Sequence, residues 1–359
     1  MTFRPNNIEF TLIRKVTAGA FLLVFQILVI SDICAQNISA PEDSIKTSLF
    51  HAIYELAEPP TIQIQTDVDQ LLEYSENEVY QEAFTTILDQ GNEMVSLPSK
   101  VRTRTYLRKK ICAIPPIRVN FPKGLLRSLG YSESDKLKLL NPCLDEAQHQ
   151  ERLYREHFLY DLYNLIDTNG LRSTIVHIQI NSNQEERYNF KAVLLEDEDA
   201  YIERKNASIV TQNNLNQRSM DRLSFLKMMF FQYMIGNTDW AIPFKHNLEM
   251  VRLPGIEKIV ALPYDFDFSG FVGQSYAEPK EDLPIKSVKE RYFFPFKISD
   301  AEYDYMIAYY QSLEKPVMDL LDKATYMAEE TRQDCSAYLA EFFEAIKDPK
   351  ALKPYIKRR

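Results

Sequence analysis

The sequence of 359 residues predicts an α+β fold with a small strand-rich part followed by a larger helical part. Three observations carry this prediction. Apolar and polar residues alternate with period two at 61–65 and in a hairpin at 174–195, which indicates strands. After residue 219 a long apolar helix over 219–235 and a tail over 299–347 are expected to be helical. Hydrophobic residues make up 45% of the chain, so a sizeable core is available.

The first 35 residues are expected to be a cleaved signal peptide. Basic residues precede an apolar run over 16–30, and Ala35 offers a small residue for cleavage. This run is shorter than the ~20 residues of a membrane-spanning helix, although an uncleaved anchor is an alternative. We therefore expect a periplasmic or secreted protein without a stable membrane span after cleavage, with a polar linker over 36–48.

The remaining chain is divided into two parts at the end of the second hairpin strand. Residues 49–200 are expected to form the strand-rich N-lobe, which includes an amphipathic helix at about 146–166. Residues 201–359 are expected to form the helical C-lobe, with a long apolar helix over 219–235. The tail from 299 to 347 is expected to form two helices broken near Lys315-Pro316.

Charge and glycine content exclude several function classes. The formal charge is −9 with only two short basic stretches, 102–110 and 357–359, which argues against nucleic acid as a partner. The chain has nine glycines and contains neither a G-x-G-x-x-G nor a Walker-type loop. Its five histidines are scattered, and no H-E-x-x-H or C-x-x-C motif supports a zinc site.

Three cysteines remain after removal of the signal peptide. Cys112 and Cys143 lie at the outer ends of two strands that can pair antiparallel through the loop at 122–134, so their side chains would meet. We expect them to form a disulfide, as an oxidising compartment permits, and two unpaired buried thiols are the alternative. The odd count leaves Cys335 over.

A candidate site follows the apolar helix of the C-lobe. Asp239 lies in the polar loop Gly236-Asn237-Thr238-Asp239-Trp240, and a predicted hairpin with its turn at 254–257 comes next. Counting back from that turn sets Asn247 opposite Tyr264, so Asn247 and Asp265 should emerge at one end of the hairpin.

The segment P-Y-D-F-D-F continues this strand in the predicted structure. Alternation places Tyr264, Phe266 and Phe268 on one face and Asp265 and Asp267 on the other. Magnesium prefers oxygen ligands of this kind. Phosphoryl transfer from Mg-ATP also needs a carboxylate that orients the attacking hydroxyl and takes its proton, and we predict that role for Asp239.

These motifs resemble two atypical kinase families. I-G-N-T-D, H-N and P-Y-D are similar to the centre of HipA-type kinases, and Y-D-F-D resembles the W-D-L-D step of CotH-type spore-coat kinases. The stretch F-K-A-V-L-L-E-D-E-D-A-Y-I-E-R resembles the CotH strand that leads to a hinge glutamate, here Glu196. The resemblance implies a two-lobed protein-kinase-like fold, a catalytic Asp239, metal binding by Asn247 and Asp265, and an assisting Asp267.

A kinase centre also needs a cation on the nucleotide phosphates, held by a carboxylate from a helix. Lys138 is our candidate, with Glu156 of the following helix as its partner. Lys136 is the alternative lysine and Glu151 the alternative glutamate.

We therefore expect an exported kinase-like enzyme that uses ATP with Mg²⁺ or Mn²⁺ and phosphorylates a hydroxyl group, on a protein substrate. Two alternatives stay open: a catalytically degenerate binding or scaffold protein of the cell envelope, and a nucleotidyl transferase that uses the same residues. The missing glycine loop and Trp240, which stands where such loops carry Arg or His, favour the degenerate protein. The retained acidic residues favour an enzyme.

Overall fold

The computed structural model describes residues 46–73, 79–104, 108–144 and 147–356. The described residues from Thr47 onward belong to one compact unit. The expected signal peptide and most of the linker lie outside the described residues, so their assignment stays a prediction. Across the described ranges, none of the helices combines the length and the apolar character that crossing a bilayer requires.

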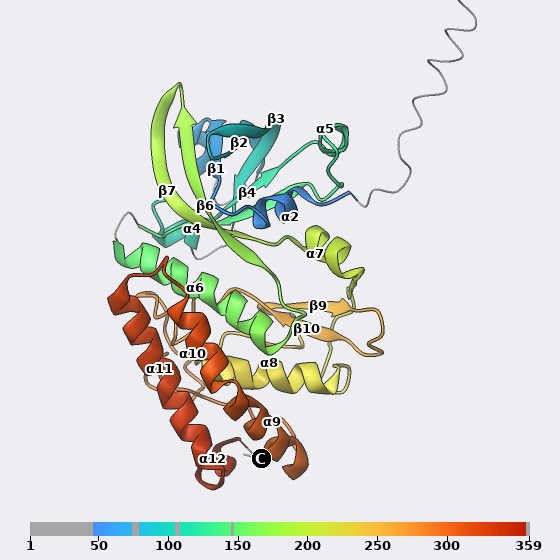
Figure 1. Cartoon of the computed structure of the whole chain (residues 1–359), viewed down its shortest axis with the longest axis vertical. Helices are drawn as coiled ribbons and strands as arrows, with labels where there is room; N and C mark the ends of the chain where they lie inside the picture. Colours follow the sequence, from blue (N-terminus) through green and yellow to red (C-terminus); the bar gives the residue numbers. More distant parts are fainter. Residues whose placement is uncertain (1–45, 74–78, 105–107, 145–146, 357–359) are drawn as a thin grey trace, which may run out of the picture. The chain divides into compact units, whose positions relative to one another are not determined.

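Seven strands close into a barrel in the order β1-β2-β3-β4-β5-β7-β6 (Figure 1). The strands are β1 (Thr61–Thr66), β2 (Gln81–Asp89), β3 (Asn92–Thr103), β4 (Ile117–Asn120), β5 (Lys136–Leu140), β6 (Ser173–Ser182) and β7 (Glu185–Leu195). All neighbours pair antiparallel except β1 and β6, which run parallel with Ile62 opposite Ile178. Alternate apolar residues of these strands point inward and form a core of their own.

The predicted two-lobed protein-kinase-like fold is wrong. The structure has a closed mixed barrel of seven strands with helices after it, instead of an open strand-rich N-lobe beside a helical C-lobe. Pairing of β1 with β6 satisfies the backbone groups of both strands and removes the two edges that an open sheet would expose. Alternation within each strand is the same in either arrangement, so the sequence pattern could not tell them apart.

Helices cover one side of the barrel and build the second half of the unit (Figure 1). They are α2 (Leu49–Tyr54), α3 (Val68–Glu73), α4 (Arg108–Ile111), α5 (Lys123–Ser128), α6 (Ala147–Ile166), α7 (Glu198–Lys205), α8 (Arg222–Met234), α9 (Asp300–Ser312), α10 (Glu314–Asp322), α11 (Glu329–Lys347) and α12 (Pro349–Ile356). The expected helices at 146–166 and 219–235 are confirmed as α6 and α8. The expected number of two helices over 299–347 is wrong, because that range holds three, α9, α10 and α11, and α12 follows it. The expected break near Lys315-Pro316 is found at Leu313, between α9 and α10. Pro316 itself lies in the first turn of α10, where its missing N–H removes no helical hydrogen bond.

A three-stranded sheet of β8 (Ser208–Ile209), β9 (Leu248–Arg252) and β10 (Val260–Pro263) packs with α6, α8 and the C-terminal helices around a second core. In the β9–β10 hairpin, Leu248 pairs with Pro263. Beyond the last pair, the Tyr264 amide donates a hydrogen bond to the Asn247 carbonyl oxygen at 3.2 Å. The predicted register, with Asn247 opposite Tyr264, is confirmed.

Cys112 and Cys143 form a disulfide, as the sequence predicts. Strands β4 and β5 pair antiparallel with Ile117 opposite Leu139, which brings the two cysteines to the same end with their Cα atoms 4.4 Å apart. Cys335 is a free, buried thiol. The bond ties the end of α4 to the chain that leaves β5.

A buried histidine predicts how stability depends on pH. His157 of α6 lies with Nδ1 2.7 Å from the Ser173 hydroxyl, and burial lowers the pKa of His157 to about 4 from its ordinary 6.5. Between these values the unfolded chain binds more protons, so stability falls as the pH drops. We expect this group to remove about 3 kcal/mol of unfolding free energy between pH ~7 and pH ~4. Urea unfolding across that range should show a shallower pH slope for His157→Gln. An unchanged slope would contradict the assignment.

Candidate functional site

The loop after α8 holds Asp239 in a defined position. Gly236 adopts a left-handed conformation with φ of 65°, and a side chain there would collide with the Tyr338 hydroxyl. The Asn237 side-chain oxygen then accepts a hydrogen bond from the Asp239 amide at 2.9 Å. These two features turn the chain out of the buried helix and direct Asp239 to the surface of the unit.

Three side-chain donors surround the Asp239 carboxylate. Its Oδ1 lies 2.9 Å from Nε2 of His246 and 3.3 Å from Nζ of Lys280, and its Oδ2 accepts from Nδ2 of Asn247 at 3.0 Å. Asn247 also donates to the Asp239 backbone oxygen at 2.8 Å. The side chain keeps 21% of its surface exposed, so the carboxylate is oriented by its partners and still reachable by a substrate.

Backbone strain marks the end of the β9–β10 hairpin. Asn247 and Asp265 both adopt left-handed conformations, with φ of 52° and 58°. A residue other than glycine costs about 1 kcal/mol in this region, and such strain concentrates at functional sites. The Tyr160 hydroxyl accepts a hydrogen bond from the Asp265 amide at 3.2 Å and helps to hold the distorted chain. Two of the predicted metal ligands therefore occupy left-handed positions, as six other non-glycine residues of the described ranges do.

Asp265 and Asp267 come together, although the predicted reason is wrong. Strand β10 ends at Pro263, so the expected alternation through Phe268 does not exist. Instead, the left-handed turn at Asp265 redirects the chain while the Phe266 ring stays buried. The two carboxylates meet because both bind the same guanidinium group, that of Arg108.

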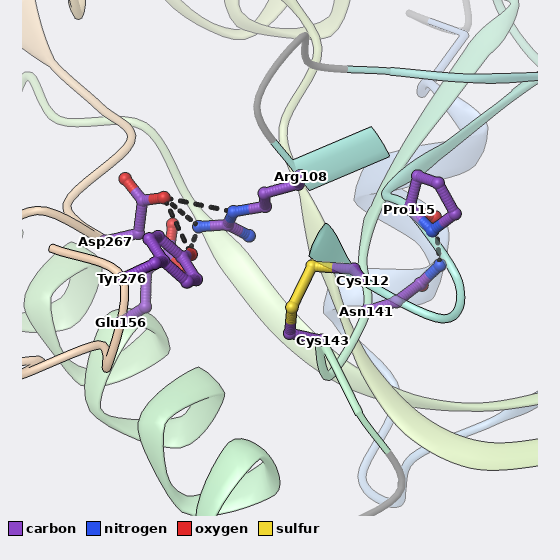
Figure 2. The surroundings of a disulfide bond; sticks show 8 residues. All are labelled: Arg108, Cys112, Pro115, Asn141, Cys143, Glu156, Asp267 and Tyr276. Atoms are coloured by element: carbon purple, nitrogen blue, oxygen red, sulfur yellow. Dashed lines mark hydrogen bonds and ion pairs between the residues drawn. A yellow bond between two sulfur atoms is a disulfide. The ribbon is translucent and has the colours of Figure 1, made fainter. Parts of the chain in front are cut away.

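Arg108 lies at the centre of a cluster of carboxylates (Figure 2). Its Nη2 is 3.0 Å from Glu156 Oε2, 3.0 Å from Asp267 Oδ2 and 3.6 Å from Asp265 Oδ1. Its Nε donates to Asp267 at 3.1 Å, and the Tyr276 hydroxyl donates to the same carboxylate at 2.9 Å. We call Arg108, Glu156, Asp265 and Asp267 the acidic centre.

The acidic centre has three carboxyl groups and one guanidinium group. Burial lowers the pKa of Arg108, but Glu156, Asp267 and Asp265 more than offset this effect, so the pKa is raised well above its ordinary value. Burial and the neighbouring Asp267 raise the pKa of Asp265, and burial raises that of Glu156. Within the described residues, Glu156 Oε1 is buried and has no hydrogen-bond partner of ordinary geometry. One guanidinium group thus faces three carboxyl groups, two of which have a raised pKa.

The predicted pairing of Lys138 with Glu156 does not form. Lys138 of β5 is buried and pairs with Glu198 at 2.5 Å and Asp197 at 3.3 Å, while Glu156 pairs with Arg108. Burial lowers the pKa of Lys138, and its two carboxylate neighbours offset only part of that shift. Glu156 of α6 therefore binds a cationic side chain, as predicted, but that side chain is Arg108 and not Lys138.

The two alternative residues lie outside the acidic centre. Lys136 pairs with Asp199 at 2.6 Å. The Glu151 carboxylate accepts a hydrogen bond from the Ala328 amide at 3.0 Å and so contacts the start of α11.

Glu196 is buried and bound by Arg204 and the Arg172 amide, with contacts of 2.6 Å and 3.0 Å. Together with Lys138 and Tyr264 it lines a cavity of about 50 Å³. Pockets for drug-sized ligands measure ~300–1000 Å³, so a nucleotide could enter only if the walls of this cavity separated.

Sequence reasoning missed several side chains of the site. Arg108 lies in the basic stretch 102–110 of an otherwise acidic chain, four residues before Cys112, and that combination is a usable clue. His246 directly precedes Asn247, but the sequence around it indicates only a loop or the start of a strand. Nothing in the sequence around Lys280 distinguishes it from a surface lysine.

The donor set can be tested against a magnesium ion. In the ranges that the structure describes, no three His, Cys, Asp or Glu side chains are arranged to hold a metal ion. Magnesium shared with nucleotide phosphates needs only one or two carboxylates, however. Asp265 is 30% exposed, the hydrogen bonds of Asn247 to Asp239 use its Nδ2 and leave Oδ1, and the carboxyl groups of the acidic centre outnumber its guanidinium group. These residues fit a cation held by Asn247 and Asp265, whereas Asp267 is engaged by Arg108.

No protein-family model and no curated protein matches the chain. Among solved structures ten chains match, including a crystal structure of a Helicobacter pylori proinflammatory kinase, CtkA. That match has 11% sequence identity and a TM-score of 0.39 over 72% of this chain and 95% of the other. It supports a kinase-like relationship at most and does not point to CotH-type kinases in particular. A likeness at this level carries no argument about function, which has to be inferred from the geometry of the site.

Proposed function

We propose that this chain is a metal-dependent phosphotransferase that moves a phosphoryl group from ATP to a hydroxyl group, on a protein substrate. The observation that carries the proposal is the contact of Asn247 with Asp239 at the end of the hairpin from which Asp265 emerges. An oriented carboxylate beside an amide oxygen and a second carboxylate is the set of groups that phosphoryl transfer from Mg-ATP uses.

In this proposal Asp239 orients the acceptor hydroxyl and accepts its proton as the bond to phosphorus forms and the bond to the leaving diphosphate breaks. His246 and Asn247 hold the carboxylate in place, and Lys280 adds a positive charge 3.3 Å from it. Asn247 Oδ1 and Asp265 would hold the metal. Bound Mg²⁺ or Mn²⁺ would offset the charge of the phosphate oxygens.

We also propose that the protein works in the periplasm or outside the cell. The sequence of the first 35 residues supports export, and so does the Cys112–Cys143 disulfide, because disulfides persist in oxidising compartments.

A second candidate is a catalytically inactive binding protein of the cell envelope. The observation that favours it is the ion pair of Arg108 with Asp267, which occupies a carboxylate that a metal-dependent enzyme would use. The cavity of about 50 Å³ beside Lys138 points the same way.

Labelled nucleotide separates these functions. We expect the purified chain with Mn²⁺ or Mg²⁺ to transfer label from γ-labelled ATP to itself or to an added protein, and Asp265→Ala to abolish the transfer. Label from the α position would indicate nucleotidyl transfer instead. If the chain shows no labelling and no thermal shift with nucleotide, both enzyme functions are excluded and the inactive binding protein is the function that is left.

A further inference from the structure

The disulfide lies next to the acidic centre and is joined to it through α4 (Figure 2). This helix is a single turn that begins at Arg108, and the Cys112 amide donates to the Arg108 carbonyl oxygen at 2.9 Å. Cys112 is bonded to Cys143, and the Ala113 amide donates to the Cys143 carbonyl oxygen at 2.9 Å. Arg108 is therefore one helical turn from Cys112, which the disulfide joins to Cys143 just after β5.

Arg108 takes the position that a cation would need in order to use all three carboxylates. Oxygens of Glu156, Asp267 and Asp265 converge on its Nη2 at 3.0, 3.0 and 3.6 Å. The side chain is only 5% exposed, so no metal ion can share that space with it. If Arg108 left, Asp267 would become a second carboxylate ligand beside Asp265, and the centre would lose its one positive charge.

Glu156 is the most deeply buried carboxylate of the acidic centre. Among the described residues, its Oε1 makes no hydrogen bond of ordinary geometry, although the side chain is fully buried and interaction with the Phe266 backbone amide lowers the pKa of Glu156 in part. A buried carboxylate oxygen is normally hydrogen-bonded or coordinated, because leaving it bare costs on the order of 1–3 kcal/mol.

The disulfide borders a pocket on the side of Cys143, whose own exposure is 7%. Cys143 and Ala113 line a pocket of about 210 Å³ together with Tyr188 and Phe190 of β7.

We propose that the Cys112–Cys143 disulfide is a redox-sensitive latch on the acidic centre. The closed latch holds Arg108 against Glu156 and Asp267 and keeps the affinity for a divalent cation low. Opening the latch releases α4, Arg108 leaves, and the affinity rises. This inference rests on the proposed function, because it takes Asp265 as a ligand of the cation.

The chemistry of opening is thiol–disulfide exchange with a dithiol. One thiolate of the dithiol attacks a sulfur of the disulfide, and its second thiolate resolves the mixed disulfide. Two electrons and two protons pass to Cys112 and Cys143, which become thiols, while the dithiol becomes a disulfide.

Binding of Mn²⁺, followed by the electron paramagnetic resonance signal of the free ion, tests the latch without any turnover. The purified chain is compared in its oxidised form and after reduction with dithiothreitol and anaerobic desalting. We expect at least tenfold tighter Mn²⁺ binding after reduction, and the same gain in Cys112→Ser/Cys143→Ser. Oxidised Arg108→Gln should bind as tightly as the reduced chain and should show no further gain on reduction. Circular dichroism confirms that each form is folded.

Arg187→Gln is the matched control, because this surface arginine lines the pocket beside the disulfide but does not contact the acidic centre. It should keep the full redox effect. Equal affinity in the oxidised and reduced chain, or a redox effect that persists in Arg108→Gln, overturns the latch. Should reduction unfold the chain, the oxidised Arg108→Gln variant still decides, because unchanged affinity there overturns the proposal. If Mn²⁺ binding responds to reduction but no label is transferred from ATP, the proposed phosphotransferase function is overturned and the latch is not.

Discussion

Replacing Asp239 by Asn is expected to lower kcat for phosphotransfer by about 10²–10⁴-fold, the usual contribution of a positioned proton acceptor. The amide keeps the size of the side chain and can still contact His246 and Lys280, but it cannot take a proton from the acceptor hydroxyl. The KM for ATP should change little, because Asp239 acts on the acceptor and not on the nucleotide. Initial rates with γ-labelled ATP measure both quantities.

The matched control for this variant is Glu281→Gln, which removes an exposed carboxylate next to Lys280 and should keep full activity. Thermal unfolding of Asp239→Asn should match that of the parent chain, so that a lost rate cannot be blamed on folding. Residual activity above about a tenth of the parent value would exclude Asp239 as the proton acceptor, since general bases contribute more than that.

Replacing Arg108 by Ala is expected to cost about 3–5 kcal/mol of unfolding free energy, as breaking a buried ion pair does. The substitution leaves Glu156 fully buried and Asp267 nearly so, both without their cation. A change of this size corresponds to a fall in Tm of roughly 6–10 °C for a domain of this size. Differential scanning calorimetry and denaturant unfolding measure it.

Two further variants identify the cause. Arg187→Ala breaks an exposed pair with Asp69 and should leave stability unchanged within error. Glu156→Gln in the Arg108→Ala background should recover part of the loss, because it removes a buried charge that has no partner. If Arg108→Ala is as stable as Arg187→Ala, the guanidinium does not hold the acidic centre together.

The loss in Arg108→Ala should also depend on pH. Burial already raises the pKa of Glu156, and removing the cation raises it further. The folded variant then holds a proton that the unfolded chain releases above its ordinary pKa near 4.3. Its stability therefore falls as the pH rises from about 5 to 8, and the difference from the parent chain should be larger at pH ~8.

Much of the local structure follows from the sequence. The spacing of apolar residues identified α6 and α8, and strand counting from one turn set Asn247 opposite Tyr264. The same counting across β4 and β5 brought Cys112 and Cys143 together. Each of these inferences spans few residues, within which the period of a helix or strand and the position of a turn fix the neighbours.

The contacts of the site between residues far apart in the sequence could not be predicted from periodicity and turn positions. Arg108 and Asp267 are 159 positions apart, and Lys138 pairs with Glu198 instead of Glu156, although both are acidic and Glu156 is nearer in sequence. The periodicity of the sequence does not indicate which distant residue a charged side chain will contact. Which carboxylate a lysine meets depends on how the strands and helices around it are placed.

The sequence by itself determined the helices α6 and α8, the hairpin with Asn247 and Asp265 at one end, and the disulfide. Only the tertiary structure decided that seven strands close through the parallel pairing of β1 with β6, and that Arg108 occupies the acidic centre. Local patterns encode which face of an element is buried, but not which distant face it will be buried against. Barrel closure and the partners of a buried charge are set by that second choice, which is made only when the whole chain is packed.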